Sequence, residues 1–231
     1  MAHWLVPGTL VTLSFLFIAA IDCSSGTTKA EVIDLPPPAL SGPESVEACI
    51  ASRRTVRSFA SRPLDRGQVS QLLWASQGVT GEEPWQRAAP SGGGLHPLDV
   101  YLVVGAGGIE GVEAGVYRYI PAGHGMVRVA SGDKRAPLSE ACLGQAWLAG
   151  APAAVVITSE NSRITAKYGN RGVRYAWIEA GCVAENLFLQ AEATGLGTGI
   201  IGAFDDNVVA RVISALPRHE PLLVMPVGYR N

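Results

Sequence analysis

The chain of 231 residues is apolar, weakly charged and rich in glycine: 16% of its residues are charged, 27 are glycine, and its formal net charge is −2. A typical domain carries about 25% charged residues and roughly 7% glycine, so this composition argues against disorder and indicates a compact, turn-rich protein. Lysine and arginine form no long run, so no nucleic acid is expected as a main partner, and the low charge suits an obligate dimer.

The chain begins with an apolar stretch at residues 4–21, which is 18 residues long and lies between a signal-peptide core and a membrane-spanning helix in character. No lysine or arginine precedes it, which weakens the signal-peptide interpretation, and Asp22 stands before Cys23 where a lipoprotein signal would have a small residue, which argues against lipidation. From the length and apolar character of the stretch we expect residues 1–22 to be a signal peptide or a membrane anchor, and the protein to be exported, periplasmic or membrane-attached. A misassigned start codon, with a cytoplasmic protein, is the alternative.

The next segment, residues 23–43, is polar and proline-rich, and we expect it to be a spacer with residues 36–38 in polyproline II conformation. Residues 44–231 are long enough for one domain with a sizeable core. Apolar spacing predicts helices at residues 44–52, 66–79, 138–143, 173–194 and 205–215. Short apolar runs predict strands at residues 99–104, 115–119, 153–158, 197–201 and 222–227. The sequence thus predicts an α+β domain.

The longest predicted helix has a continuous apolar stripe and a glycine stop at Gly195. The stripe comprises Ala176, Ala180, Val183, Leu187 and Ala191. Residues 81–94 form a long loop rich in proline and glycine, which in a compact domain is more often functional than idle.

The four cysteines, Cys23, Cys49, Cys142 and Cys182, show no CxxC spacing and have no histidine nearby in sequence. No metal site is predicted from them. Cys49 and Cys182 fall within helical patterns and are expected to be small core residues. In an exported protein a pair could be oxidised, but the sequence does not say which.

Three arginines close to one another, Arg53, Arg54 and Arg57, could form an anion site. Arg53 and Arg57 would share a face if the preceding helix continued, and guanidinium groups suit phosphate or the carbonyl edge of a flavin. The alternative is a solvated basic helix end, where arginine is favoured by the helix dipole.

Residues 197–202 match the dinucleotide-binding pattern GxGxxG, with Glu220 about where a ribose-binding acid would stand. That pattern should connect a strand to a helix. Here it follows a long helix and itself contains the predicted strand, so a dinucleotide site is not expected.

Taken in order, residues 53–59, 90–97, 167–171, 195–204 and 226–229 resemble the nitroreductase family of FMN-dependent oxidoreductases. The likeness is greatest to its SagB-type azoline dehydrogenase branch. It implies a nitroreductase-like fold with a central, mostly antiparallel sheet flanked by helices, and a homodimer. It also implies FMN, ping-pong hydride transfer through flavin N5 to a small-molecule substrate, and NAD(P)H or a quinol as electron donor.

The resemblance also assigns site residues. By position, the arginine segment contributes Arg53, Arg54, Thr55 and Arg57 to FMN binding. A loop that reaches the flavin of the other subunit contributes Pro90, Ser91, Gly92 and Gly93. The resemblance also implies main-chain donors near flavin N5, where a side chain would collide with the ring. The residues at these positions are Gly199, Ile201, Gly202 and Ala203. The pair implicated in deprotonating an azoline ring is Lys167 and Tyr168.

The chain departs from the family at several positions. His96 stands where tyrosine is usual, and either influences the choice of substrate or is a solvent-facing loop histidine. Cys182 and Glu185 replace an expected histidine and glutamine, as packing or dimer-face changes. A later basic pair is missing, so Arg230, or Arg53 with Arg57, is expected to bind the flavin phosphate.

Two other functions remain open. One is azoline-to-azole oxidation in peptide natural-product maturation, in which Lys167 and Tyr168 would act on the ring, whereas otherwise they would only hold the loop before the long helix. The other is a non-catalytic flavin-binding protein.

Overall fold

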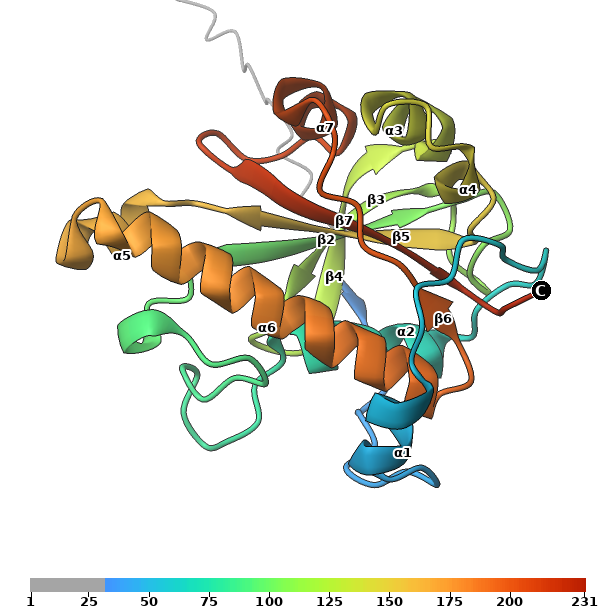
Figure 1. The fold of residues 1–231 in the computed structure, drawn as a ribbon, viewed down its shortest axis with the longest axis horizontal. Helices are drawn as coiled ribbons and strands as arrows, with labels where there is room; N and C mark the ends of the chain where they lie inside the picture. Colours follow the sequence, from blue (N-terminus) through green and yellow to red (C-terminus); the bar gives the residue numbers. More distant parts are fainter. Residues whose placement is uncertain (1–31) are drawn as a thin grey trace, which may run out of the picture.

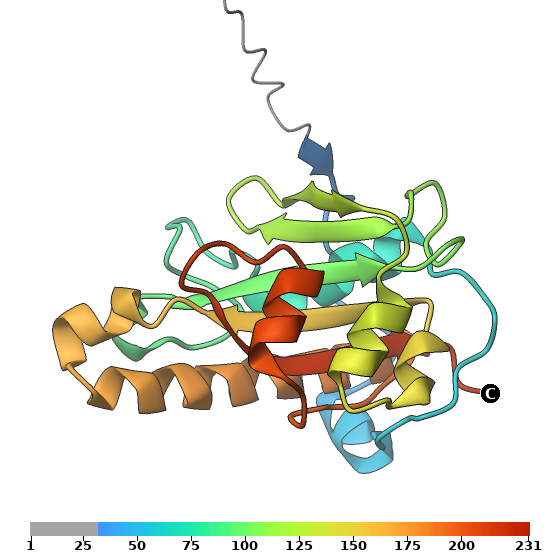
Figure 2. The ribbon, with the colours of Figure 1, turned by 90° about the horizontal axis from the view of Figure 1, so that it is seen from above.

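The computed structural model describes residues 32–231 as one seven-stranded sheet with helices on both faces (Figures 1 and 2). The strand order is β1-β4-β3-β2-β5-β7-β6, and all neighbouring pairs are antiparallel. The strands are β1 (Val32–Asp34), β2 (Leu98–Val104), β3 (Gly115–Ile120), β4 (Gly125–Ser131), β5 (Ala153–Ser159), β6 (Gly197–Thr198) and β7 (Glu220–Gly228). The predicted α+β class and mostly antiparallel sheet are confirmed.

The helices form two layers. Residues of α2 (Arg66–Gln77) and α6 (Arg171–Ala193) join one core cluster. Residues of α3 (Arg135–Ala141), α4 (Ala146–Ala149) and α7 (Asp206–Val212) join or pack against a second cluster. Figure 2 shows α3, α4 and α7 in front of the sheet and α2 behind it. The remaining helices, α1 (Val46–Ser52) and α5 (Ser162–Tyr168), pack on α6.

The central strands β2 and β5 are apolar on both faces because each face is covered by helices. Successive side chains of a strand point to opposite faces. Accordingly Val155 and Ile157 of β5 join the cluster of α2 and α6, whereas Ala154 and Val156 join the other. All seven residues of β5 are buried. This explains why the strand appears in the sequence as an unbroken apolar run.

Local capping fixes the helix ends. Asp65 accepts a hydrogen bond from the Gln68 amide, and the Gln68 side chain accepts one from the Asp65 amide, which makes a capping box at the start of α2. Ser45 caps α1 and Asp205 caps α7, so both helices begin one or two residues later than predicted. Gly195, with φ at 72°, follows α6 and acts as its predicted stop.

Four elements were not predicted. Strand β4 and helices α4 and α5 have short or polar sequences, and β1 lies within the predicted spacer. The spacer prediction is therefore wrong for its described part, because β1 pairs with β4 and the Ala39 amide donates to Gln71 Oε1 at 2.9 Å. The predicted strand at residues 197–201 is reduced to β6, after which Ile201 bridges Val224.

The predictions for residues 1–22 and for Cys23 lie outside the described residues. Within residues 32–231 no helix is long and apolar enough to cross a membrane. Cys49 and Cys142 are buried and form no disulfide in this part of the chain, whereas Cys182 is only partly buried. Cys182 is thus not the core residue that its helical position predicted.

Candidate functional site

The first group of predicted residues meets where the chain leaves α1 and runs beside β6. Thr55 forms a parallel bridge with Thr198, and the Val56 amide donates to Thr198 O at 2.9 Å. We call residues 53–57 and 197–203 together the arginine–glycine half of the site. Arg53 has ψ at 133°, so the helix does not continue. The expectation that Arg53 and Arg57 share a helical face is wrong, because main-chain bonding to β6 replaces the next turn.

The three arginines have different partners. Arg54 directs Nη1 to Ala51 O at 3.0 Å and to Arg53 O at 2.7 Å, which occupies it within its own segment. The Arg53 guanidinium lies 5.3 Å from the Phe188 ring centroid, and its Nε is 3.8 Å from Glu185 Oε1. Arg57 lies 5.7 Å from the Trp147 ring centroid. Arg53 and Arg57 therefore keep guanidinium donors for an anionic or carbonyl ligand.

The glycines of residues 197–202 have different roles. A Cβ on Gly197 would lie 2.5 Å from Val56 Cγ2, and one on Gly199 would lie 2.9 Å from both Trp147 Cη2 and Val56 O. A Cβ on Gly202 would meet nothing within 4 Å. Gly197 and Gly199 are thus required by contacts within the chain, whereas the space at a Gly202 Cβ is open.

Main-chain donors are also distributed unevenly. The Ile201 amide donates to Val224 O at 2.8 Å, and its side chain is 2% exposed. The exposed amides of Gly202 and Ala203 donate to no acceptor in residues 32–231. Of the residues expected to present main-chain donors, Gly202 and Ala203 have N–H groups available to a ligand, whereas the Ile201 N–H is already bonded.

The second group of predicted residues forms what we call the loop half, residues 90–94 with Lys167 and Tyr168. Gly93 lies in the short 3₁₀ turn Gly92–Gly94 with φ at 65°. A Cβ on Gly93 would lie 2.6 Å from Tyr168 Oη and 3.1 Å from Lys167 Nζ. The absence of a side chain there leaves room for both polar groups. Lys167 and Tyr168 occupy the last turn of α5 and not a loop.

Near the loop lies a set of buried or half-buried polar residues: Arg87, Gln77, Glu179, Ser91 and His96. Arg87 Nη1 donates to Gln77 Oε1 at 3.3 Å, and Gln77 Nε2 donates to Glu179 Oε1 at 3.1 Å. The His96 amide donates to Ser91 Oγ at 2.9 Å. Arg87 is therefore bonded to α2, α2 is bonded to α6 through Gln77 and Glu179, and residues 91–96 are closed by a hydrogen bond of their own.

Three residues of this set have shifted pKa values, and burial lowers that of Arg87. Burial raises the pKa of Glu179, and the hydrogen bond from Gln77 and the charge of Arg87 oppose that rise. Burial, followed by the nearby Arg87 charge, lowers the pKa of His96. His96 is 8% exposed and its Nε2 is 2.8 Å from Trp85 O, so the alternative of a solvent-facing loop histidine is wrong.

The two halves lie apart along α6 within one chain (Figure 1). Phe188 of α6 is beside Arg53, whereas Tyr175 of α6 is beside Gly92, with its Cβ 3.3 Å from the position of a Gly92 Cβ. At 1.5 Å per residue, the 13 residue steps from Tyr175 to Phe188 span about 20 Å. A single chain does not bring the arginine–glycine half and the loop half together.

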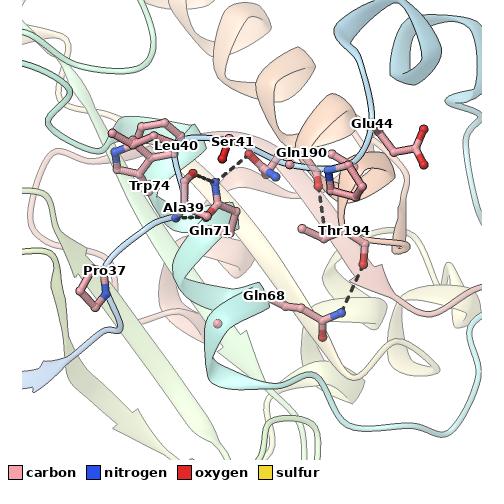
Figure 3. Close-up of a pocket in the computed structure, with 14 residues that line it drawn as sticks. Pro37, Ala39, Leu40, Ser41, Glu44, Gln68, Gln71, Trp74, Gln190 and Thr194 are labelled. Atoms are coloured by element: carbon pink, nitrogen blue, oxygen red, sulfur yellow. Dashed lines mark hydrogen bonds between the residues drawn. The ribbon is translucent and has the colours of Figure 1, made fainter.

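A cavity of about 500 Å³ lies elsewhere, between residues 37–44, α2 and α6 (Figure 3). Gln71 spans it, donating to Ala39 O at 3.0 Å and to Gln190 Oε1 at 3.2 Å. None of the predicted site residues lines it. Its amide side chains already bond to one another, so we assign the site to the two halves on chemical grounds and not to this cavity.

Sequence reasoning missed Trp147, Glu179, Gln77 and Arg87. Trp147 packs on Gly199 and Arg57, but it belongs to the unpredicted helix α4. The others become neighbours only when α2, α6 and the loop come together. A glutamate at position 179, one turn after Ala176 on the apolar stripe of α6, was the sequence signal that could have indicated a buried carboxyl group.

Comparison with known proteins gives consistent matches over most of the chain. The Nitroreductase family model matches residues 50–229. Nitroreductase MJ1384 of Methanocaldococcus jannaschii is 40% identical over 79% of this chain and 90% of its own length. The microcin B17-processing protein McbC of Escherichia coli is 30% identical over 63% of this chain and 55% of its own length. A nitroreductase structure from Ralstonia eutropha superposes with a TM-score of 0.75 at 30% identity, covering 87% of this chain and 90% of the other.

Proposed function

The chain belongs to the nitroreductase family, and from this premise we propose that it is an FMN-dependent oxidoreductase. The observation that carries the proposal is the arrangement of the arginine–glycine half. There the guanidinium groups of Arg53 and Arg57 and the free main-chain N–H groups of Gly202 and Ala203 lie on segments joined through β6. These donors fit a ligand that combines a phosphate with a flat, carbonyl-edged ring.

Bound FMN would supply two-electron hydride chemistry through N5, with NAD(P)H or a quinol as the donor. The residues of the chain would supply position and charge. Arg53 and Arg57 would neutralise the phosphate or polarise the pyrimidine edge. Gly202 and Ala203 would donate main-chain hydrogen bonds, and the open space at Gly202 would let the ring approach. Lys167 Nζ and Tyr168 Oη would give or take the proton that accompanies the hydride.

The FMN proposal is tested by purification of the full chain. We expect a yellow protein that releases FMN on denaturation and whose bound flavin is bleached by NAD(P)H or a quinol. A colourless protein that takes up no FMN on reconstitution would end the proposal. A yellow protein whose flavin no donor reduces would favour the non-catalytic flavin-binding alternative.

The second part of the proposal is a homodimer with shared sites, because each chain holds the two halves about 20 Å apart. An exposed apolar surface is available for the partner on α1 and α6. Trp177 and Ile178 are 60% and 59% exposed, and Val46 and Ile50 are 63% and 55% exposed. A Cβ on Gly181 of the same α6 surface would meet nothing within 4 Å, which allows a neighbouring helix to approach closely.

Shared sites can be tested by unfolding and refolding together two variants, Arg53→Ala and Lys167→Ala, and measuring azoline oxidation at limiting FMN, where each variant alone should be impaired. In a mixed dimer one site carries both changes and the other carries neither. Random pairing should therefore restore about a quarter of the wild-type sites. No recovery, or a stable flavin-loaded monomer in light scattering, would contradict the shared-site dimer.

A second candidate function is oxidation of an azoline ring in a modified peptide. Two observations favour it: the similarity to a microcin B17-processing protein and the convergence of Lys167 and Tyr168 on Gly93. Stopped-flow measurement with an azoline-containing peptide should show flavin reduction by the peptide itself. Export or membrane attachment through residues 4–21 also remains part of the proposal and rests on the sequence alone. Fractionation of cells that express the full chain tests it.

A further inference from the structure

Arg163 is a half-buried arginine for which the proposed reaction has no role. It lies in the first turn of α5, four residues before Lys167, so the two side chains are neighbours on the helix. Its guanidinium group contacts three segments of the chain, at Asp99, His96 and Glu160. Fixing a long side chain costs conformational entropy, so a side chain fixed at three points beside the loop half calls for an explanation.

The nearest partner of the guanidinium group is Asp99 of β2. Arg163 Nη1 lies 2.7 Å from Asp99 Oδ2, and the Asp99 side chain is 13% exposed. The next arginine is farther away, with Arg118 Nη1 at 3.9 Å from Asp99 Oδ1. Asp99 Oδ2 has no well-directed hydrogen bond in residues 32–231, but charges this close and partly shielded from water attract one another strongly. The ion pair therefore ties the first turn of α5 to β2.

The same nitrogen ties α5 to the end of the loop. Arg163 Nη1 donates to His96 O at 3.3 Å. The backbone of His96 is left-handed, with φ at 44°, a conformation that is uncommon outside glycine and persists only where the surroundings hold it. Its other contacts are the bond from its amide to Ser91 Oγ, at 2.9 Å, and the contact of its Nε2 with Trp85 O, at 2.8 Å. Arg163 is thus one of three contacts that hold His96.

Helix α5 meets the loop at both of its ends. In its first turn Arg163 donates to the loop carbonyl described above, and in its last turn Lys167 Nζ lies 3.1 Å from the position of a Gly93 Cβ. Between them Ile164 is fully buried, with its Cδ1 3.3 Å from the position of a Gly92 Cβ. Apolar packing has no preferred direction, whereas a hydrogen bond does. Arg163 can therefore fix how α5 is oriented on the loop, which the packing of Ile164 alone does not.

Glu160 directs the guanidinium group toward these partners. Arg163 Nε donates to Glu160 Oε2 at 2.8 Å, and the Glu160 amide donates to Pro97 O at 2.9 Å. Because the guanidinium group is planar and rigid, a bond at Nε limits where Nη1 can point. A lysine at position 163 would keep a cation with N–H donors and lose only the donor at Nε, so the site offers a conservative replacement.

We propose that Arg163 is a positioning residue: its guanidinium group holds the first turn of α5 to β2 and to the loop, and so sets the place of Lys167 beside Gly93. The arrangement itself is a property of the folded chain. Its effect on turnover rests on the proposed oxidoreductase function.

The structural part is tested by hydrogen–deuterium exchange on the full chain without added flavin. In Arg163→Met we expect amides 94–96 and 164–169 to exchange about tenfold faster, the effect of losing roughly one charged hydrogen bond. Asp99→Asn, which removes the charge and keeps the shape, should accelerate the same amides about threefold. Arg163→Lys should exchange more slowly than Arg163→Met, and Arg211→Met, the same change at an exposed position of α7, should match wild type.

The effect on chemistry is tested in flavin-loaded protein. Arg163→Met should slow the substrate half-reaction about tenfold and leave flavin reduction by the donor unchanged, and Arg163→Lys should recover most of the rate. Because Arg163 acts through Lys167, the double variant of Arg163→Met and Lys167→Ala should be no slower than Lys167→Ala alone.

Exchange in β5 shows whether Arg163→Met remains folded, and Asp99→Asn keeps the test decisive if it does not. Unchanged exchange at residues 94–96 and 164–169 in the folded variant would overturn the proposal. Losses of rate that multiply in the double variant would overturn it as well. A failure of the protein to bind FMN would leave the exchange result standing, so failure of the two proposals can be told apart.

Discussion

In the arginine–glycine half, main-chain hydrogen bonds to β6 position residues 53–57, whereas in the loop half side chains of α5 and α6 position residues 90–94. Arg53 and Arg57 therefore project from a backbone that does not depend on them. Gly93 lies beside Lys167 and Tyr168, and Gly92 lies beside Tyr175. Replacement of an arginine side chain in the first half should therefore alter ligand binding alone. In the second half a side-chain change should alter the shape of the loop or the chemistry.

The largest expected effect is that of Lys167→Ala in the loop half. We expect the variant to fold, to bind FMN and to be reduced by its electron donor. Oxidation of an azoline-like substrate should fall by ~10²–10⁴-fold, the usual contribution of a general acid or base. Rapid-mixing measurement of the two half-reactions checks it, with Lys134→Ala as the control because Lys134 lies at the start of α3, outside both halves.

Undiminished azoline oxidation in Lys167→Ala would remove Lys167 from the mechanism. A lower melting temperature with equal loss for every substrate would mean that Lys167 only supports the end of α5. The loop half would then have a structural role only, and a generic flavin reductase would be the better description of the protein.

A smaller effect is expected for Arg53→Ala in the arginine–glycine half. Loss of a charged hydrogen-bond partner costs roughly 1.5–3 kcal/mol, so FMN affinity should fall at least tenfold. Arg54→Ala is the matched control, because Arg54 bonds to Ala51 O and Arg53 O and should lose less than about threefold. Fluorescence titration of flavin-free protein measures both dissociation constants. Equal losses would show that the two arginines are not distinguished as the structure indicates.

Gly199→Ala and Gly202→Ala should separate packing from ligand approach within the same half. The Gly199 methyl group would lie 2.9 Å from Trp147 Cη2 and from Val56 O, so we expect the free energy of unfolding to fall by about 1–3 kcal/mol. The Gly202 methyl group meets no atom of the chain within 4 Å, so stability should change by less than about 0.5 kcal/mol while FMN binding weakens. Thermal melting with and without FMN measures both effects. A destabilised Gly202→Ala with unchanged FMN affinity would reverse the assignment.

The sequence predicted best those features that depend on local pattern. The stripe on α6, the Gly195 stop and the apolar run of β5 were all visible, because each follows from spacing along one element. The sequence could not predict β1, since this three-residue edge strand is defined by its pairing with β4. Strand β4 was missed because Arg128 interrupts its apolar pattern. The same reason explains why α5 was expected to be a loop.

For the site, sequence resemblance indicated the segments but not their contacts. It did not distinguish Gly199 from Gly202, because the difference lies in the position of Trp147 on α4. It assigned Arg54 the same role in FMN binding as Arg53, although the Arg54 side chain bonds to its own segment. Glu179 accepts its hydrogen bond from Gln77 of α2, which lies 102 residues away in the sequence. No spacing rule predicts such a contact.

The smallest effect should appear when the pH is lowered, and it should appear in the loop half. Burial and the Arg87 charge lower the pKa of His96, so the folded protein binds this proton less readily than the unfolded chain. The stability that His96 contributes is therefore complete above its ordinary pKa of about 6.5 and is lost as the pH falls through that value toward the lowered one. Between pH 7.5 and 5.5, the wild-type amides of residues 92–96 should exchange progressively faster relative to amides in β5. His96→Asn, which loses the contact with Trp85 O but tolerates the positive φ of 44°, should start less protected and change less with pH.

His124 and His219 are common to both proteins, so they contribute equally to the acid response. An equal acid response in wild type and His96→Asn would assign the sensitivity to those histidines and remove His96 as a pH-dependent support of the loop.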